Sequence, residues 1–396
     1  MATIAETIRP LRIVHYVPGI RLEQGGVVRA ILDWCTVFAV RGHQMTLLAY
    51  QGNDIPREWL TGAPGSPVAK VIPPPRAMPG KPLGAEALRV AEQAIKDADV
   101  LHLHGPWLDG NRQLANIARR HRVPYIVTLH GMLDDWSMTQ RAMKKRLYMR
   151  LWGRRFLDNA ACVHCTAEAE LAQSRRWFDN PATAVLPYLV ELTAFARLPG
   201  PGLATPLIPA GMRDRPKVLF LSRLHEQKGI DILIRAAAAL RDSGASFTLL
   251  IAGNGEPGYE RRLYEMVEQL NLRDRVVFLG LVTGEQKVSL YQSADVFVLP
   301  TRHENFGLVL TEAMACGTPV VTTKGTDIWS ELQSAGGVIA ENTPEGIAAA
   351  VRGIFQKPQE LAALGQRGRA WVFETLAVEP LAQRYEGMYR AQAARA

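Results

Sequence analysis

Residues 218–229 read Val-Leu-Phe-Leu-Ser-Arg-Leu-His-Glu-Gln-Lys-Gly, and this stretch decides the fold class of the chain. Its apolar start, Val218–Leu221, predicts a short buried strand, and a helical pattern runs from Gly229 to Leu240. Two cations, Arg223 and Lys228, bracket the turn between them. Cations beside the free N–H groups of a helix N-terminus suit a diphosphate. A strand, a turn and a helix in this order are typical of a parallel α/β sheet.

The same alternation continues through the C-terminal half of the chain. Strand-like and helical runs follow one another at Phe247–Ile251, Tyr259–Leu270, Val276–Leu279, Val296–Leu299, Leu308–Cys316 and Pro319–Thr322. Short apolar strands separated by helices predict βαβ units, so we expect a doubly wound α/β domain here.

A second alternation fills the N-terminal half. Its strands are expected at Leu11–Val17, Met45–Tyr50, Val100–Leu103 and Tyr125–Leu129, and its helices at Val27–Val40 and Arg112–His121. The segment Ala63–Pro82 is rich in proline and glycine and is interpreted as a surface loop. This half is therefore predicted to be a second domain of the same class.

The domain boundaries follow from chain length and composition. A chain of 396 residues exceeds the roughly 250–300 residues at which a single core stops growing, so two domains are expected. Proline and glycine cluster between Pro199 and Gly211, which indicates a linker. We therefore predict domains at residues 1–195 and 212–378. Residues 379–396 are expected to form a helix that packs back on the first domain.

Bulk composition fits a soluble globular protein, with 47% hydrophobic and 21% charged residues. The four cysteines are interpreted as reduced structural residues, since Cys162 and Cys165 lack enough neighbouring ligands for zinc. The segment Met1–Pro10 has no apolar run behind a cationic start, and no run of about 18 apolar residues occurs. A cytoplasmic protein is expected.

The positive charge is concentrated in the N-terminal half. Residues 1–190 carry 24 Lys and Arg against 16 Asp and Glu, whereas residues 191–396 carry 22 of each. Between Arg141 and Arg155 seven basic residues occur without an acid, interleaved at helical spacing with Leu147, Leu151 and Trp152. Two interpretations stay open: contact with an anionic membrane surface or lipid-linked acceptor, and a domain helix with a solvated basic face. No nucleic-acid partner is expected.

A second motif reads Glu304-Asn-Phe-Gly307 and is followed by Glu312. It comes directly after the strand Val296–Leu299 and runs into a helix that starts near Gly307. Carboxylates accept hydrogen bonds well from the vicinal hydroxyls of sugars and ribose, and Gly307 lets a backbone approach closely. We expect Glu304 in the loop and Glu312 in the second helical turn to face one ligand.

Together these motifs resemble the family-4 retaining glycosyltransferases of the GT-B fold. The resemblance rests on Arg223 with Lys228, on Glu304-x7-Glu312, and on the surrounding run from Ala294 to Val321. It covers most of the second domain. In the first domain it rests on three shorter marks: Gly25-Gly26, Thr128-Leu-His-Gly131 and residues 164–170. The family's usual Glu-Gly-Phe-Gly is Glu304-Asn-Phe-Gly307 here.

The resemblance implies two Rossmann-like domains that face a central cleft. It implies that Arg223 and Lys228 bind the donor diphosphate and that Gly25 and Gly26 approach it from the first domain. Glu304 would accept from hydroxyls of the transferred sugar, Glu312 would bind the ribose, and His130 would lie beside the transferred sugar. The catalytic set is thus His130, Arg223, Lys228 and Glu304, and further donor contacts are expected at Asn254, Leu281, Val282, Asn305, Phe306, Gly307 and Leu308.

The implied reaction moves a hexose from a UDP- or GDP-linked donor to a lipid-linked or growing glycan, in bacterial exopolysaccharide, lipopolysaccharide or glycolipid synthesis. Charge builds on the leaving diphosphate, which Arg223 and Lys228 would stabilise, so no metal or other cofactor is expected. By resemblance, the leaving phosphate takes the acceptor proton in a same-face attack. His102 and His104, at a strand end, are candidate acceptor contacts.

Three other functions compete with this interpretation. A nucleotide-sugar epimerase or a phosphorylase could share the architecture, but nothing marks a pyridoxal-binding lysine. A dinucleotide-dependent oxidoreductase would carry Gly-x-Gly-x-x-Gly at the first strand–helix turn, where Gly25-Gly26 stands instead. A non-catalytic nucleotide-sugar-binding protein would need no transfer chemistry, and the intact Arg223, Lys228, Glu304 and Glu312 argue against it.

Overall fold

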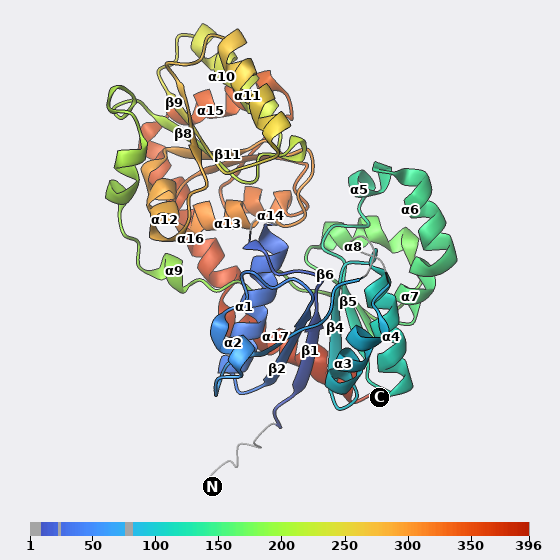
Figure 1. Ribbon diagram of the computed structural model, residues 1–396. Coiled ribbons are helices and arrows are strands. Elements are labelled where there is room, and N and C mark those ends of the chain that lie inside the picture. The colour runs from blue at the N-terminus through green and yellow to red at the C-terminus, as the bar shows by residue number, and fades with distance from the viewer. Residues whose placement is uncertain (1–8, 23–24, 76–81, 396) are drawn as a thin grey trace. The chain divides into compact units, whose positions relative to one another are not determined.

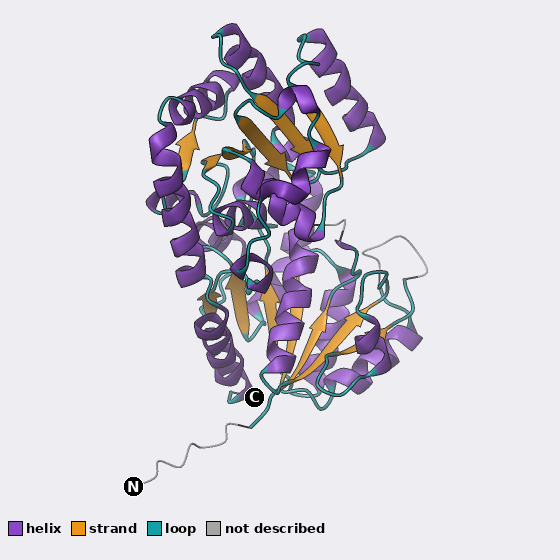
Figure 2. Ribbon diagram, turned by 90° about the vertical axis from the view of Figure 1, so that its left-hand side faces the viewer, coloured by secondary structure: helices purple, strands orange, loops and turns teal. Residues whose placement is uncertain are grey.

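The computed structural model describes residues 9–22, 25–75 and 82–395, and the chain divides into two compact units (Figure 1). Unit 1 consists of Met1–Val190 together with Val378–Ala396, and unit 2 of Glu191–Ala377. Residues 1–8, which belong to the N-terminal segment Met1–Pro10 discussed above, lie outside the described residues. Each unit carries its own parallel sheet with helices on both faces, which confirms the doubly wound α/β prediction for both halves (Figure 2).

The sheet of unit 1 has seven parallel strands in the order β3-β2-β1-β4-β5-β6-β7. The order reverses direction between β1 and β4, whose register pairs His15 with His102. The strands are β1 (Arg12–Tyr16), β2 (Gln44–Ala49), β3 (Val68–Val71), β4 (Val100–His104), β5 (Tyr125–Thr128), β6 (Cys162–Cys165) and β7 (Thr183–Val185).

The helices of unit 1 include one from the far end of the chain, α17, which contacts both α1 and β4. Short strand-to-helix connections bring successive helices back across the sheet. The helical elements are α1 (Gly26–Val40), α2 (Arg57–Thr61), α3 (Ala85–Ile95), α4 (Asp109–Arg120), α5 (Asp135–Thr139), α6 (Ala142–Tyr148), the π-helical turn η2 (Met149–Gly153), α7 (Arg154–Asp158), α8 (Glu168–Ser174), the 3-10 turn η3 (Arg175–Trp177) and α17 (Val378–Ala393).

Two separate cores lie on the two faces of this sheet. Because side chains alternate along a strand, Val14 and Tyr16 of β1 join the core beneath α3 and α4, whereas Ile13 joins the core beneath α1 and α17. The second core is aromatic: α1 contributes Trp34, and α17 contributes Tyr385 and Tyr389, all buried. Residues from the two ends of the chain therefore share one core.

Unit 2 has a six-stranded parallel sheet in the order β10-β9-β8-β11-β12-β13. Its strands are β8 (Lys217–Leu221), β9 (Thr248–Ala252), β10 (Val276–Gly280), β11 (Val296–Leu299), β12 (Val320–Thr323) and β13 (Val338–Ala340). Its helical elements are α9 (Thr193–Ala196), η4 (Pro201–Leu207), η5 (Ala210–Met212), η6 (Glu226–Lys228), α10 (Ile230–Asp242), α11 (Pro257–Gln269), α12 (Gly284–Ser293), α13 (Leu308–Ala315), α14 (Trp329–Ser334), α15 (Pro344–Phe355) and α16 (Pro358–Thr375).

Helix starts in unit 2 follow ordinary capping chemistry. At α15, the Thr343 side chain accepts from the Gly346 N–H at 3.0 Å and Pro344 occupies the first helical position. The Thr343–Gly346 bond satisfies one backbone N–H group that would otherwise lack a partner at the helix start. Pro344 has no N–H group, so it needs no such partner. The local sequence thus sets the helix boundary before tertiary packing does.

Two sequence interpretations are corrected by the structure. The segment Ala63–Pro82 is not simply a loop, because it contains the edge strand β3. The Pro/Gly-rich stretch from Pro199 to Gly211 is not an extended linker. It forms η4, which packs against α12 through bonds from the Gly200 and Ala204 N–H groups to Gln292 and Ser289. Proline rings pre-set the backbone for such tight turns, so composition alone misleads.

Candidate functional site

The candidate site of unit 2 lies where its strand order reverses, between β8 and β11. Loops from the carboxyl ends of these neighbouring strands meet there, which is where open α/β sheets bind ligands. The loop after β8 carries Arg223 and Lys228, and the loop after β11 carries Glu304. The two motifs that the sequence singled out are therefore adjacent in space.

Backbone contacts hold these two loops together. The Arg302 N–H donates to the Gln227 backbone carbonyl at 2.8 Å, and the side-chain amide Nε2 of Gln227 donates back to the His303 carbonyl at 3.0 Å. Gly229 has a φ of 70°, and a Cβ built on it would lie 1.9 Å from the Pro300 carbonyl oxygen. Only glycine fits this position, because the residue must adopt a left-handed backbone conformation and let the backbone of Pro300 approach closely.

Lys228 and Glu304 form an ion pair between the two loops. The Lys228 side chain is only 9% exposed and that of Glu304 17%, so the pair is largely removed from water. Arg223, on the same loop, is exposed and forms no hydrogen bond or ion pair with a side chain among the described residues. The site thus presents one cation held by a carboxylate and a second that faces solvent.

Glu312 lies on α13 and has its own partners. Its carboxylate accepts from Lys287 Nζ at 2.8 Å and from the Tyr291 hydroxyl at 2.8 Å. Burial, with the Glu312 carboxylate beside it, raises the pKa of Tyr291 well above its ordinary value, so this hydroxyl stays a donor. Lys287 and Tyr291 were not foreseen from the sequence, where nothing distinguishes them from other residues of a surface helix.

The residues between the two glutamates form the turn into α13. Gly307 is the N-cap of α13 with a φ of 71°, and Phe306 and Asn305 are buried. Leu308 is the first residue of the helix. Backbone bonds from the Glu304 N–H to Gly325, and from Asp327 to the Glu304 carbonyl, fix the loop on its other side.

Three of the expected donor contacts, Asn254, Leu281 and Val282, follow the ends of β9 and β10, farther along the same sheet edge. The Asn254 carbonyl accepts from the Leu224 N–H at 2.9 Å, which connects this edge to the loop after β8. Leu281 is 66% exposed directly after β10, whereas Val282 is buried. Of these two residues, Leu281 is therefore the one that solvent reaches.

In unit 1, Gly25 and Gly26 stand at the start of α1, after β1. Gly25 is the N-cap with a φ of 100°, and no side chain caps the helix. The first turn of α1 contains no acidic residue. A helix start of this kind leaves backbone N–H groups without helical partners, and the diphosphate contact of these two glycines stays a prediction.

His130 follows β5 and is held from both sides. Its φ is 57°, a left-handed value that is uncommon for a residue with a side chain. Nε2 of the ring lies 2.9 Å from Nδ1 of His104, and Nδ1 lies 2.8 Å from the Tyr188 hydroxyl. Burial lowers the pKa of His130 to about 3, so the ring is neutral.

Glu170 fixes the backbone beside His130. Its carboxylate is completely buried and accepts from the N–H groups of Gly131 and Thr166. A buried carboxylate with charge-assisted bonds to two backbone groups is a rigid support. The positive φ of His130 is therefore held by contacts on both the ring and the next peptide.

His102 and His104 belong to the interior of unit 1. They are 0% and 3% exposed, and both nitrogens of each ring have partners inside the unit. In this structure neither ring offers a nitrogen to an acceptor, so their predicted role as acceptor contacts is set aside. Their partners His15 and Tyr389 were not foreseen, because a histidine inside an apolar run resembles an ordinary strand residue.

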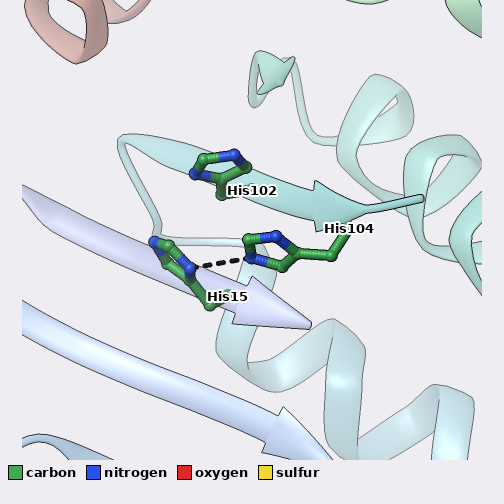
Figure 3. A group of neighbouring side chains, drawn as sticks. All are labelled: His15, His102 and His104. Carbon is green, nitrogen blue, oxygen red and sulfur yellow. Dashed lines mark hydrogen bonds between the residues drawn. The ribbon is translucent and has the colours of Figure 1, made fainter. Parts of the chain in front are cut away.

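His15, His102 and His104 are also the described residues whose donor atoms could surround a metal ion, since one ring nitrogen of each lies within 4.8 Å of the others (Figure 3). No carboxylate or thiolate joins them in this group. Each ring already has hydrogen-bonding partners, so a metal would have to replace them.

The basic segment, residues 141–155, folds as α6, the π-helical turn η2 and the start of α7 rather than as one uniform helix. Four of the twelve large apolar side chains recorded as exposed lie here: Met143, Leu147, Leu151 and Trp152. Within the described ranges, no helix has the length and apolar character needed to cross a bilayer. Apolar side chains interleaved with cations on one segment are typical of an interfacial surface.

Two family models match the chain. "Glycosyl transferase 4-like domain" matches residues 25–188, and "Glycosyl transferases group 1" matches residues 210–371. A GDP-mannose-dependent alpha-(1-6)-phosphatidylinositol monomannoside mannosyltransferase of Mycolicibacterium smegmatis is 32% identical over 274 residues, which cover 66% of this chain and 69% of that protein. A D-inositol 3-phosphate glycosyltransferase of Salinispora tropica is 38% identical over 255 residues, covering 60% of this chain and 52% of that one.

The matched region spans 69% and 52% of the length of these two relatives, and only 28% of an uncharacterized glycosyltransferase of Methanocaldococcus jannaschii that is 46% identical over 114 residues. Among solved structures, Anabaena Alr3699/HepE in complex with UDP-glucose aligns with a TM-score of 0.78 at 19% identity, over 96% of this chain and all of that one. At this identity the likeness shows the fold alone, which is the predicted GT-B fold. By family models, relatives and architecture, the chain belongs to the family-4 glycosyltransferases, GT-B enzymes that take their sugar from a nucleotide-sugar donor.

Proposed function

We propose that this protein is a retaining hexosyltransferase that moves a sugar from a UDP- or GDP-linked donor to a lipid-linked or growing glycan. The observation that carries the proposal is the Lys228–Glu304 pair at the point where the strand order of unit 2 reverses. A cation held in a low-dielectric site stabilises charge that develops on a leaving diphosphate. Arg223, exposed on the same loop, supplies the second cation.

The roles of the other residues follow from this placement. Glu304 accepts from hydroxyls of the transferred sugar, Glu312 binds the ribose, and Asn254 and the backbone at Leu281 and Val282 contact the base. Backbone groups from Asn305 to Leu308 hold the donor at the start of α13. From unit 1, Gly25 and Gly26 contribute N–H groups to the diphosphate, and His130 contacts the transferred sugar.

Transfer proceeds by same-face displacement through an oxocarbenium-like state. The bond from the anomeric carbon to the leaving phosphate breaks, the acceptor oxygen bonds to the same face, and the leaving phosphate takes the acceptor proton. Cations replace a metal in this scheme. Retention is tested by proton NMR of the new glycoside, and a product of inverted configuration would overturn the mechanism.

The relatives support an acceptor on a lipid or a phosphorylated polyol. The Mycolicibacterium relative is named for a phosphatidylinositol monomannoside, and the Salinispora relative for inositol 3-phosphate. We place this protein in bacterial exopolysaccharide, lipopolysaccharide or glycolipid synthesis, in the cytoplasm. Its alternative, a binding protein without transfer chemistry, predicts nucleotide binding but no turnover.

Donor binding is tested by thermal shift with UDP, GDP and ADP. One nucleotide should raise the melting temperature by mass action, and Lys228→Ala should abolish that shift. Lys217→Ala is the matched control, because Lys217 lies at the opposite end of the same strand, β8. A shift that survives Lys228→Ala, or is lost equally in Lys217→Ala, removes the diphosphate assignment.

We further propose that residues 141–155 contact an anionic membrane surface. Leu151 is 51% exposed between cations of this segment, and Leu60 is 47% exposed far from it. Leu151→Asp should abolish sedimentation with phosphatidylglycerol liposomes at low salt, whereas Leu60→Asp should sediment like the unaltered protein. Failure of the unaltered protein to sediment would end this proposal.

A further inference from the structure

Four neighbouring strands of unit 1 place polar side chains on one face of an otherwise apolar sheet. β1 contributes His15, β4 contributes His102 and His104, β5 contributes Thr128 and β6 contributes His164. The strand neighbours of these residues, such as Ile13, Val100, Ile126 and Cys162, belong to the core beneath α1 and α17. Side chains two apart on a strand share a face, so the polar residues lie beneath the same helices.

These residues form one connected series of hydrogen bonds. Figure 3 shows its centre, where Nδ1 of His15 lies 3.0 Å from Nε2 of His104. On one side, His104 Nδ1 meets His130 Nε2 at 2.9 Å, and His130 Nδ1 meets the Tyr188 hydroxyl at 2.8 Å. On the other side, His15 Nε2 lies 3.4 Å from the Tyr389 hydroxyl of α17.

The series continues from Tyr389 to a backbone carbonyl. The Tyr389 hydroxyl lies 2.8 Å from Nδ1 of His102, whose Nε2 lies 2.6 Å from Thr128 Oγ1. The Thr128 hydroxyl lies 2.8 Å from Nδ1 of His164, and Nε2 of His164 lies 3.0 Å from the Leu186 carbonyl oxygen. Every link is buried, and all of its residues belong to unit 1.

The Leu186 carbonyl gives the series a direction. A carbonyl oxygen only accepts, so His164 carries its proton on Nε2 and accepts at Nδ1 from the Thr128 hydroxyl. The Tyr385 hydroxyl also lies 3.2 Å from this Nε2, but its own proton goes to the Pro187 carbonyl at 2.9 Å. That hydroxyl has one proton, so it accepts from Nε2–H of His102, which in turn accepts at Nδ1 from Tyr389. Each neutral ring has one nitrogen that donates and one that accepts, so the assignment can be extended beyond Tyr389.

The remaining protons follow from the proton assigned to Nε2 of His164. Tyr389 has given its proton to His102, so it accepts from Nε2–H of His15, and His15 accepts at Nδ1 from Nε2–H of His104. His104 then accepts at Nδ1 from Nε2–H of His130, and Tyr188 donates to Nδ1 of His130. All five histidines are therefore Nε2–H tautomers.

The rings are neutral because burial disfavours their charged form. Desolvation lowers the pKa of His15 and His130 to about 3 and that of His164 to about 4, and it places the pKa of His102 and His104 well below the ordinary value. The other titratable and charged groups around the helix side of this series are tyrosines 188, 385 and 389, Cys35, Glu170 and Arg384. Glu170 bonds to backbone N–H groups beside His130.

We propose that this series of hydrogen bonds, completed by Tyr389 from the C-terminal helix, fixes the tautomer and ring orientation of His130. His104, His15 and Tyr389 are then positioning residues for the transfer reaction, although none of them touches the sugar. The inference rests on the proposed role of His130 beside the transferred sugar. By this inference α17 does more than pack in the core of unit 1, because its Tyr389 helps to orient His130 of the proposed site.

The experiment compares Tyr389→Phe with Tyr385→Phe. Both tyrosines are completely buried on α17. The Tyr385 hydroxyl donates to the Pro187 carbonyl at 2.9 Å and lies 3.2 Å from Nε2 of His164, so it touches the Leu186 end of the series but carries none of the bonds between His130 and His164. Long-range ¹H–¹⁵N NMR spectra distinguish the protonated from the bare nitrogen of each ring. In the unaltered protein all five buried rings should be protonated at Nε2.

Tyr389→Phe cuts the connection between His130 and the Leu186 carbonyl. His15, His104 and His130 can then shift their protons together to Nδ1, with His130 donating to Tyr188. His102 and His164 keep their Nε2 protons, because their own path to Leu186 is intact. The kcat of transfer should fall about fivefold with the KM for the donor unchanged, since one positioning bond is lost. Tyr385→Phe should change neither the spectra of His15, His104 and His130 nor kcat.

Three results would overturn the proposal. The first is a His130 ring protonated at Nδ1 in the unaltered protein, which needs no variant to observe. The second is a His130 spectrum in Tyr389→Phe that matches the unaltered protein. The third is stoichiometric zinc that is lost in His104→Gln, because those nitrogens would then bind metal. Nucleotide thermal shifts, measured on the same samples, report separately whether the proposed donor binding holds.

Discussion

Unit 1 is expected to be unstable to mild acid, because it buries five neutral histidines. An ordinary histidine has a pKa of about 6.5, whereas burial lowers the pKa of His15 and His130 to about 3 and that of His164 to about 4. His102 and His104 are shifted in the same direction. Between the folded and unfolded pKa values the unfolded chain binds more protons, so stability falls as the pH falls below about 6.5.

The magnitude follows from linkage. For one such histidine, lowering the pH from 7.5 to 5.5 removes about 1.4 kcal/mol from the free energy of unfolding. Five of them together remove about 7 kcal/mol, which is comparable to the entire stability of an ordinary domain, about 5–15 kcal/mol. Unit 1 should therefore unfold on acidification to about pH 5, and unit 2, which carries only His225 and His303, should not.

Hydrogen exchange measured by mass spectrometry at pH 7.5 and 5.5 separates the two units. After correction for the intrinsic exchange rate, peptides from β4 and β5 should lose protection at the lower pH, while peptides from β8 and β11 should keep it. His15→Gln removes one titrating ring, so the pH dependence of the unfolding free energy should fall by about one fifth. Equal protection of β4 and β5 at both pH values would refute the assignment of neutral buried rings.

Two further predictions concern unit 2. Lys228→Met leaves the Glu304 carboxylate without its cation and should cost about 3 kcal/mol, whereas the double variant Lys228→Met/Glu304→Gln should recover most of that loss in urea titrations. Additive losses in this cycle would show that the pair is not coupled. Gly229→Ala brings a methyl group against the Pro300 carbonyl and should lower the free energy of unfolding by about 3 kcal/mol or more. The loss should appear as a lower melting temperature. An unchanged melting temperature would contradict the close approach of the two loops.

Much of the architecture could be predicted because its signal is local. Apolar runs such as Val218–Leu221 and Val296–Leu299 correspond closely to β8 and β11, and the phosphate-type turn and Glu304 motif meet as expected. Short strands escaped notice for a physical reason. β6 reads Cys-Val-His-Cys, and its histidine is tolerated only because Thr128 and Leu186 satisfy it from distant parts of the chain.

The partners of the site residues could not be predicted, because they depend on long-range pairing. Nothing near Glu312 in sequence indicates that Lys287 and Tyr291 will hold its carboxylate. Likewise, Tyr389 lies 287 residues beyond His102, and only the return of α17 brings the two together. Sequence motifs thus identify the groups that carry charge, and packing decides which groups orient them.

The return of α17 to unit 1 also has a consequence for biosynthesis. A ribosome delivers this helix only after all of unit 2 has been made, so until then α1 alone covers the aromatic and histidine-rich face of the N-terminal sheet, and the part beneath α17 stays exposed. Unit 2 can close first, although its residues emerge later, which reverses the usual N-to-C order of domain maturation. A nascent chain stalled before residue 378 should consequently expose that face to chaperones, while its second unit is already resistant to protease.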